Sequence, residues 1–272
     1  MSRLARRFAD LAAQHRRALV TYITAGDPAP QTTAGLLHAL AAAGADVLEL
    51  GVPFSDPTAD GPAIQAAHER ALAHGVRLAD AIDMVAEFRR DDDATPVVLM
   101  GYLNPIEAMG ETAFADAAAA AGVDGVIAVD LPPEEAEPLH ALLRERGIDL
   151  IFLIAPTTTA ARIERIADLA SGFVYHVSLK GTTGAGNLDT AAVAGKLAEI
   201  RTHTHLPIAV GFGVRNGESA AALAAAADAV VVGSALIERI VAADNDAARR
   251  QAAGNFVGEL RAALDTATAA PA

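Results

Sequence analysis

Two carboxylates stand out because of the residues around them. Glu49 lies in the apolar run 46–51 (DVLELG), where an ionised carboxylate would be buried. Burial raises the pKa of a carboxyl group toward the range that suits general acid–base chemistry. Asp60 follows in the proline-rich loop 52–62. Glu49 predicts acid–base catalysis, with a structural ion pair as the alternative. Asp60, taken alone, is equally well explained as a helix N-cap.

Three glycine-rich segments each follow an apolar run near the C-terminus. They are 178–187 (SLKGTTGAGN), 211–215 (GFGVR) and 233–235 (GSA). Glycine lets the backbone approach a ligand closely, and a helix N-terminus binds phosphate well. Tight turns explain any one of these segments, whereas three together predict a phosphate site. The acidic chain does not prevent this, since exposed charges are screened beyond about 8 Å.

Other polar residues near the predicted strands carry weaker signals. Tyr175 in the run 172–177 either reaches the site or satisfies a hydrogen bond in the core. His176 alternates to the opposite side and is expected to pack against helices. His203 and His205 have no third ligand nearby in sequence, so no metal site is predicted.

The elements that must position these residues alternate regularly along the chain. Short runs rich in Val, Ile and Leu are typical of strands that are buried on both faces of a parallel sheet. There are eight such runs: 18–24, 46–51, 96–101, 124–130, 148–154, 172–177, 206–211 and 228–233. Between them lie alanine-rich stretches with spaced charges, expected as helices at about 1–16, 30–43, 62–92 in two pieces, 104–121, 133–146, 158–170, 189–203, 216–227 and 234–268.

Eight buried strands, each followed by a helix, predict an α/β fold with a single (β/α)8 TIM barrel over residues 1–272. The pattern adds an N-terminal extra helix and a short extra helix after strand eight. The end of the chain is expected to fray after Leu264. An open doubly wound sheet is the second interpretation, but the segment after the first strand, 24–28 (TAGDP), lacks its glycine-rich fingerprint.

Composition excludes several classes of protein. The 272 residues are 52% hydrophobic and 20% charged, which excludes a disordered chain. The net charge of −13 disfavours nucleic acid and anionic membranes as partners. The sequence has no cysteine, which excludes disulfides and thiolate metal sites. The basic residues near the N-terminus precede no apolar signal region, and no run is long enough to span a membrane, so a cytoplasmic location is expected.

The segment 48–65 (LELGVPFSDPTADGPAIQ) closely resembles the signature of the tryptophan synthase alpha chain family. Segments 22–28, 102–106, 130–135 and 211–213 also resemble that family, so the similarity covers essentially the whole chain. The resemblance implies a (β/α)8 barrel that cleaves indole-3-glycerol phosphate into indole and glyceraldehyde 3-phosphate for tryptophan biosynthesis. It also implies a partner, the pyridoxal-phosphate-bearing beta chain, which receives the indole in an α2β2 complex.

The resemblance assigns roles to particular positions. Glu49 and Asp60 match the catalytic pair, and the alpha chain itself needs no metal or organic cofactor. The positions implied to line the indole pocket or to bind the rest of the substrate are Tyr22, Met100, Ile127, Tyr175 and Thr183. Those implied to bind the phosphate are Gly184, Gly211, Phe212, Gly213, Gly233 and Ser234. The loop 178–189, rich in Gly and Thr, is expected to close over the site as a lid.

The expected reaction is a retro-aldol cleavage. Indole is a poor leaving group as a carbanion, so its C3 atom should be protonated before the bond breaks. Asp60 is expected to accept the indole N–H, and Glu49 to remove the glycerol hydroxyl proton and to deliver the proton to C3. A sugar-phosphate isomerase or decarboxylase, a non-catalytic activating subunit and a lyase that works without a partner are the alternatives.

Overall fold

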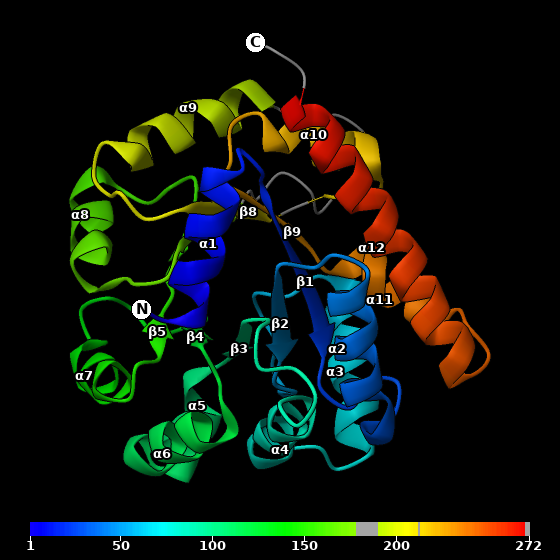
Figure 1. Ribbon diagram of the computed structural model, residues 1–272. Coiled ribbons are helices and arrows are strands. Elements are labelled where there is room, and N and C mark those ends of the chain that lie inside the picture. Colours follow the sequence, from blue (N-terminus) through cyan, green and yellow to red (C-terminus); the bar gives the residue numbers. More distant parts are fainter. Residues whose placement is uncertain (178–189, 212, 270–272) are drawn as a thin grey trace.

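Nine parallel strands form one curled sheet in the computed structural model, which describes residues 1–177, 190–211 and 213–269 (Figure 1). Their order across the sheet is β5-β4-β3-β2-β1-β9-β8-β7-β6. The strands are β1 (Ala18–Thr24), β2 (Val47–Gly51), β3 (Val97–Gly101), β4 (Gly125–Ala128), β5 (Asp149–Leu150), β6 (Leu153–Ile154), β7 (Val174–Val177), β8 (Ile208–Gly211) and β9 (Ala229–Val232). The predicted TIM-barrel fold is confirmed.

The ring closes at the predicted strand 148–154, which is divided into β5 and β6. The amide of Ile151 still donates to Val126 of β4 at 2.9 Å. The carbonyl of the next residue, Phe152, accepts from the amide of Tyr175 in β7 at 3.0 Å. The chain therefore changes partner strand between these two residues, and this step joins the two ends of the sheet.

Helices surround the ring, and one further helix, α1, crosses its amino-terminal end (Figure 1). Leu4, Phe8 and Leu11 of α1 are buried against the inward-facing residues of the strands, so α1 closes that end of the barrel. The helices are α1 (Arg3–Ala13), α2 (Thr33–Ala42), α3 (Pro62–Ala73), α4 (Leu78–Phe88), α5 (Leu103–Met109), α6 (Glu111–Ala121), α7 (Glu137–Glu145), α8 (Ala160–Leu169), α9 (Thr190–Arg201), α10 (Gly217–Ala224), α11 (Ser234–Val241) and α12 (Asp246–Ala269), with a 3-10 turn η1 (Pro30–Thr32).

Both predicted extra helices are present, as α1 and α11, but three helix predictions were wrong in detail. The helix predicted at 104–121 is two helices, because Gly110 between them has a φ of 90°. The helix predicted to open at Pro133 begins at Glu137 instead, since 133–135 form a turn. The helix predicted at 234–268 is also two helices, α11 and α12, and α12 ends at Ala269. None of the helices in the described residues is long and apolar enough to cross a membrane.

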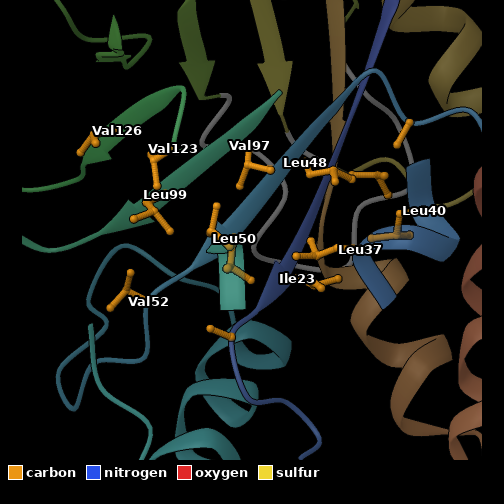
Figure 2. Packing of buried hydrophobic residues seen from close by; sticks show 14 of the residues in the cluster. Ile23, Leu37, Leu40, Leu48, Leu50, Val52, Val97, Leu99, Val123 and Val126 are labelled. Atoms are coloured by element: carbon orange, nitrogen blue, oxygen red, sulfur yellow. The ribbon is translucent and has the colours of Figure 1, made fainter. Parts of the chain in front are cut away.

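Alternate residues of each strand face opposite sides of the barrel wall. In β2, Leu48 and Leu50 pack outward in the main apolar core, together with residues such as Leu37 of α2 (Figure 2). Val47 and Glu49 point into the barrel instead. The main core thus lies between strands and helices, and the barrel interior is left for a second cluster and for the site.

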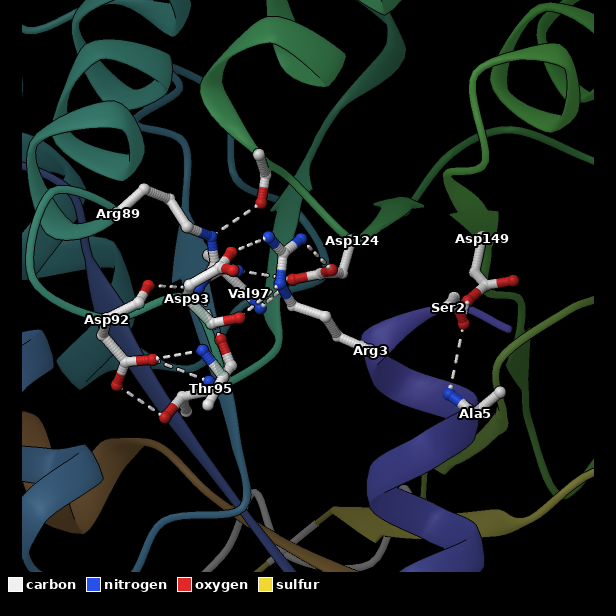
Figure 3. A network of polar contacts seen from close by, with 12 residues as sticks. Ser2, Arg3, Ala5, Arg89, Asp92, Asp93, Thr95, Val97, Asp124 and Asp149 are labelled. Atoms are coloured by element: carbon white, nitrogen blue, oxygen red, sulfur yellow. Dashed lines mark hydrogen bonds and ion pairs between the residues drawn. The ribbon is translucent and has the colours of Figure 1, made fainter.

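The amino-terminal rim is held by polar side chains that accept backbone amides (Figure 3). Asp124, which precedes β4, accepts the amide of Val97 in β3 at 2.8 Å and pairs with Arg89 at 2.5 Å and Arg3 at 3.1 Å. The same arrangement recurs around the ring at Leu19–Asp46, Leu150–Ser171 and Ile208–Asp228, at 2.8, 3.1 and 2.9 Å. Each pair ties one strand to the start of the next along the ring.

Replacing Asp124 should destabilise the protein strongly. The D124A variant leaves the Val97 amide without its acceptor and removes the carboxylate that pairs with Arg89, whose guanidinium keeps only backbone carbonyls as hydrogen-bond partners in the described residues. We therefore expect the free energy of unfolding to fall by about 3–5 kcal/mol. Urea unfolding followed by circular dichroism measures this. D93A is the control, because the Asp93 side chain is 88% exposed although it also pairs with Arg3. If D124A and D93A lower the free energy of unfolding equally, burial of the Asp124 carboxylate has no special role.

Candidate functional site

Glu49 points into the barrel near the carboxyl-terminal ends of the strands. Its backbone neighbours across the sheet are Tyr22 in β1 and Val98 in β3. Glu49 is only 1% exposed, and its Oε2 atom has no hydrogen-bond partner among the described residues. A structural ion pair, the alternative interpretation, is therefore absent from the described part of the chain. A buried carboxyl group with an unused oxygen is available to a bound molecule.

Burial raises the pKa of Glu49 to about 8, and the negative charge of Asp60 adds to the effect. Both causes disfavour the ionised carboxylate. Glu49 is therefore mostly protonated near neutral pH, and it can donate a proton and take one back within the working range of an enzyme.

Asp60 does not cap helix α3, since Gly61 occupies the N-cap position. Its Oδ2 atom accepts a hydrogen bond from the Tyr102 hydroxyl at 2.9 Å and lies 3.9 Å from Nε2 of His68. Burial raises the pKa of Asp60, while the Tyr102 hydrogen bond and His68 oppose that rise. The carboxylate is thus held in a buried position by two polar side chains, which a simple helix cap would not need.

Tyr102 and His68 were not predicted as site residues. Tyr102 directly follows β3, where a polar aromatic residue at the carboxyl end of a strand was the available signal. His68 lies in α3, where no local pattern marks it and only its burial in the folded chain reveals it. Both also anchor the loop that carries Asp60: the Tyr102 hydroxyl accepts the amide of Ala59, and Nδ1 of His68 accepts that of Phe54. Phe54 stacks on Tyr102 with ring centroids 4.8 Å apart.

The residues predicted for the indole pocket gather on the inner wall. Met100 pairs with Ile127 in register, and Tyr22 pairs with Glu49. Tyr175 also reaches the site, because the charges of Glu49 and Asp60, after burial, raise the pKa of its hydroxyl. The alternative interpretation was that the Tyr175 hydroxyl makes a hydrogen bond in the core, and no such hydrogen bond is found among the described residues. Their binding roles stay predictions.

Two glycines make room for the tyrosine hydroxyls. A Cβ atom on Gly51 would lie 2.1 Å from the Tyr22 hydroxyl, and one on Gly211 would lie 2.0 Å from that of Tyr175. Each distance is far below van der Waals contact, so any side chain there would displace a ring from the inner wall. Gly211, predicted as a phosphate contact, therefore also has a steric role.

The predicted phosphate residues that the structure describes lie at the carboxyl-terminal ends of β8 and β9. Gly213 follows β8 with a φ of 73°, which favours glycine. Gly233 is the N-cap of α11 and Ser234 is its first residue. The first amides of a helix have no partner within the helix and point at a ligand placed there. Thr183, Gly184 and Phe212, and the lid predicted at 178–189, lie outside the described residues.

His176 is buried on the opposite side from Tyr175, as predicted, and its Nδ1 atom lies 2.9 Å from the carbonyl of Ile154. Within the described ranges, no group of His, Asp and Glu side chains could hold a metal ion. The barrel and the two carboxyl groups at the carboxyl-terminal ends of its strands place the protein among the TIM-barrel enzymes.

Comparison with known proteins narrows this class to one family. The family model described as tryptophan synthase alpha chain matches residues 8–265. The tryptophan synthase alpha chain of Thioalkalivibrio sulfidiphilus is 60% identical over 266 residues, covering 97% of this chain and 100% of the relative. That of Nitrosococcus oceani is 62% identical over 240 residues, covering 88% of this chain and 89% of the relative. The chain belongs to the tryptophan synthase alpha chain family.

Solved structures agree with the sequence comparison. The crystal structure of tryptophan synthase subunit alpha from Legionella pneumophila superposes with a TM-score of 0.91 at 44% identity, covering 98% of this chain and 99% of that one. A chain of tryptophan synthase from M. tuberculosis, in its aminoacrylate-bound form, gives a TM-score of 0.87 at 35% identity, with 97% and 100% covered.

The buried carboxyl group of Glu49 should make stability depend on pH. Below pH 4.5 Glu49 is protonated in both the folded and the unfolded states, so it has no effect. Between pH 4.5 and about 8 only the unfolded chain releases the proton, which lowers the free energy of unfolding as pH rises. Glutamine mimics the protonated form, so E49Q should gain stability relative to the wild type over this range and no further above it.

Urea unfolding of both proteins at a series of pH values measures the difference. The change with pH is the relevant quantity, because the glutamine amide adds a constant offset. E145Q is the control, since the Glu145 side chain is 71% exposed. A stability difference between E49Q and the wild type that is flat from pH 4.5 to 8 would show that Glu49 ionises normally in the folded protein.

Proposed function

We propose that the paired carboxyl groups of Glu49 and Asp60 carry out the reaction of this family. The protein is a carbon–carbon lyase of tryptophan biosynthesis, which cleaves indole-3-glycerol phosphate into indole and glyceraldehyde 3-phosphate. The observation that carries the assignment is Glu49 itself. It is a fully buried acid with an unused oxygen and a pKa of about 8, beside a second acid held by polar side chains.

Glu49 is proposed to move both protons of the cleavage. Its protonated carboxyl group delivers a proton to C3 of the indole ring, which leaves positive charge on the ring nitrogen. The bond between C3 and the glycerol carbon then breaks, and its electron pair returns to the ring. The resulting Glu49 carboxylate takes the proton of the hydroxyl group on that carbon as the aldehyde forms. The acid is thereby restored for the next cycle.

Asp60 is proposed to stabilise the charge on the ring nitrogen by accepting its N–H. Within the described residues, the polar contacts of this carboxylate fall on Oδ2, from Tyr102 and His68. Oδ1 is therefore the oxygen assigned to the substrate. Two acids in different surroundings hold different protonation states at one pH, and this is what the reaction requires.

The remaining residues are proposed to position the substrate. Tyr22, Met100, Ile127 and Tyr175 form the walls for the indole ring. Thr183, Gly184, Gly211, Phe212, Gly213, Gly233 and Ser234 are assigned to the rest of the substrate and its phosphate. The phosphate is remote from the bond that breaks, so its binding serves orientation, and helix α11 contributes its positive N-terminal end.

The proposal includes a tryptophan synthase beta chain as the partner that receives indole in an α2β2 complex. The relatives are named as one chain of tryptophan synthase, which supports a second chain. The exposed residues Ser55 and Asp56 beside the site, and Asn104 in α5, are candidate contacts. We further assign the protein to the cytoplasm and treat residues 1–272 as one domain, because the main core joins residues from Leu19 to Leu264.

Indole release from indole-3-glycerol phosphate tests the function. We expect slow release by the purified chain and a sharp rise when a cognate beta chain is added, whereas fast release by the chain alone would favour a lyase without a partner.

The E49Q variant tests the role of Glu49. It should reduce turnover at least about a hundredfold while the circular dichroism spectrum remains unchanged. In the wild type, kcat/KM should fall above pH 8, where Glu49 loses its proton. Near-normal turnover by E49Q would remove Glu49 from the mechanism.

Ser234 tests the phosphate site separately. The S234D variant places a negative charge at the N-terminus of α11, which the helix dipole tolerates but a bound phosphate repels. We expect KM to rise at least about tenfold with little change in kcat, measured with indole-3-glycerol phosphate. S234A, which removes only the hydroxyl group, is the control and should change KM much less. If KM is the same in S234D and the wild type, the phosphate lies elsewhere.

A further inference from the structure

His68 has a fixed protonation pattern inside helix α3. The residue is 2% exposed, and its Nδ1 atom lies 2.9 Å from the backbone nitrogen of Phe54. A backbone amide can only donate, so Nδ1 must accept and the ring proton must be on Nε2. Burial lowers the pKa of His68, which keeps the ring neutral. The loop that carries Asp60 thus selects one tautomer of the histidine.

The protonated Nε2 atom faces two groups of the site. It lies 3.3 Å from the Tyr22 hydroxyl and 3.9 Å from Oδ2 of Asp60. Since Nε2 is the donor, the Tyr22 oxygen accepts, and its own proton is free for Thr24 Oγ1 at 3.3 Å. One backbone amide, that of Phe54, therefore sets the donor-to-acceptor direction of the hydrogen bonds that run through His68 and Tyr22 to Thr24.

We propose that His68 is a positioning residue of the reaction, which orients Tyr22 by donating its N–H to the tyrosine hydroxyl and holds the same nitrogen 3.9 Å from Oδ2 of Asp60. This inference rests on the proposed function, because it assigns to Asp60 the task of receiving the indole N–H as a carboxylate. Nothing in the local sequence of α3 distinguishes His68 from its neighbours, and its role arises only because α3 packs against β1 and the Asp60 loop.

The charged and titratable groups around Asp60 and His68 determine how the His68 N–H affects the protonation of Asp60. Asp60 faces Glu49 of β2, Tyr22 of β1, Tyr175 of β7 and Tyr102 at the start of α5, while His68 also faces Asp27. Burial of the Asp60 carboxylate favours its protonated form. The hydrogen bond from the Tyr102 hydroxyl opposes this, and so does the electrostatic effect of the His68 N–H, whose nitrogen lies 3.9 Å from Oδ2.

Loss of the His68 donor should therefore appear on the acid side of the pH profile. In H68L, Asp60 keeps Tyr102 but faces an apolar side chain, so it should bind a proton at higher pH. We expect the acid limb of kcat/KM to move up by about one pH unit, which is about a tenfold loss of rate on that limb and a smaller loss at the plateau. The glutamine of H68Q carries an N–H donor at similar reach and should restore the acid limb.

Steady-state indole release between pH 5 and 9 by the full chain with a beta chain measures these profiles. H74L is the matched control, because His74 ends the same helix but is exposed, and the one hydrogen bond of its ring to the residues that the structure describes is with the carbonyl of Pro28. Its profile should equal that of the wild type. Thermal unfolding of each variant separates a shifted profile from a loss of folded protein.

The outcomes are distinct. A shifted acid limb in H68L, with recovery in H68Q, supports the inference. An even loss of rate at every pH, or an unchanged profile, overturns it and leaves His68 as a loop anchor. If H68L does not fold, H68N replaces it under the same criteria, since its shorter side chain can accept from Phe54 but does not reach Asp60. Absence of indole release by the wild type would instead refute the proposed function.

Discussion

The closed ring of parallel strands is the constraint on which the site depends. Closure occurs where the chain between β5 and β6 leaves β4 and joins β7, at Ile151 and Phe152. Once the ring is closed, alternate residues of every strand must share one narrow interior. Helix α1 fills the amino-terminal end of that interior, so the space near Glu49 is bounded by protein below and around it. Water is excluded from a carboxyl group that would otherwise ionise.

The two ends of the barrel use polar groups in opposite ways. At the amino-terminal rim, Asp46, Asp124 and Asp228 accept backbone amides and pair with arginines, so their charges are matched. Near the carboxyl-terminal rim, Glu49 has an oxygen with no partner in the described residues. Matched charges stabilise the fold, whereas an unmatched acid destabilises it and is available to a substrate. The stabilising ion pairs and the candidate site thus occupy separate ends of the same strands.

The loop that carries Asp60 is held by two side chains of similar design. Tyr102 accepts the amide of Ala59 and donates to Asp60. His68 accepts the amide of Phe54 and donates its N–H to the Tyr22 hydroxyl, with the same nitrogen 3.9 Å from Asp60. In each case a backbone amide of the loop occupies the acceptor atom of the side chain, so the O–H or N–H of that side chain is left to donate within the site. The position of the loop and the polarity around the carboxylate are therefore coupled, and neither can change alone.

The sequence by itself determined the alternation of strands and helices and the TIM-barrel fold, because the apolar runs of buried strands are a local signal. It also predicted Glu49 as a site residue, as an acid in an apolar run, and Asp60 through the resemblance to the family. Local turns limited the accuracy of the predicted helix boundaries, since Gly110 divides a predicted helix and 133–135 form a turn before α7. Only the tertiary structure decided that Asp60 faces inward instead of capping α3, and that His68 lies beside it. The reason is physical: hydrogen bonds between α3, β1 and the loop join residues far apart in the chain, and no local pattern specifies them.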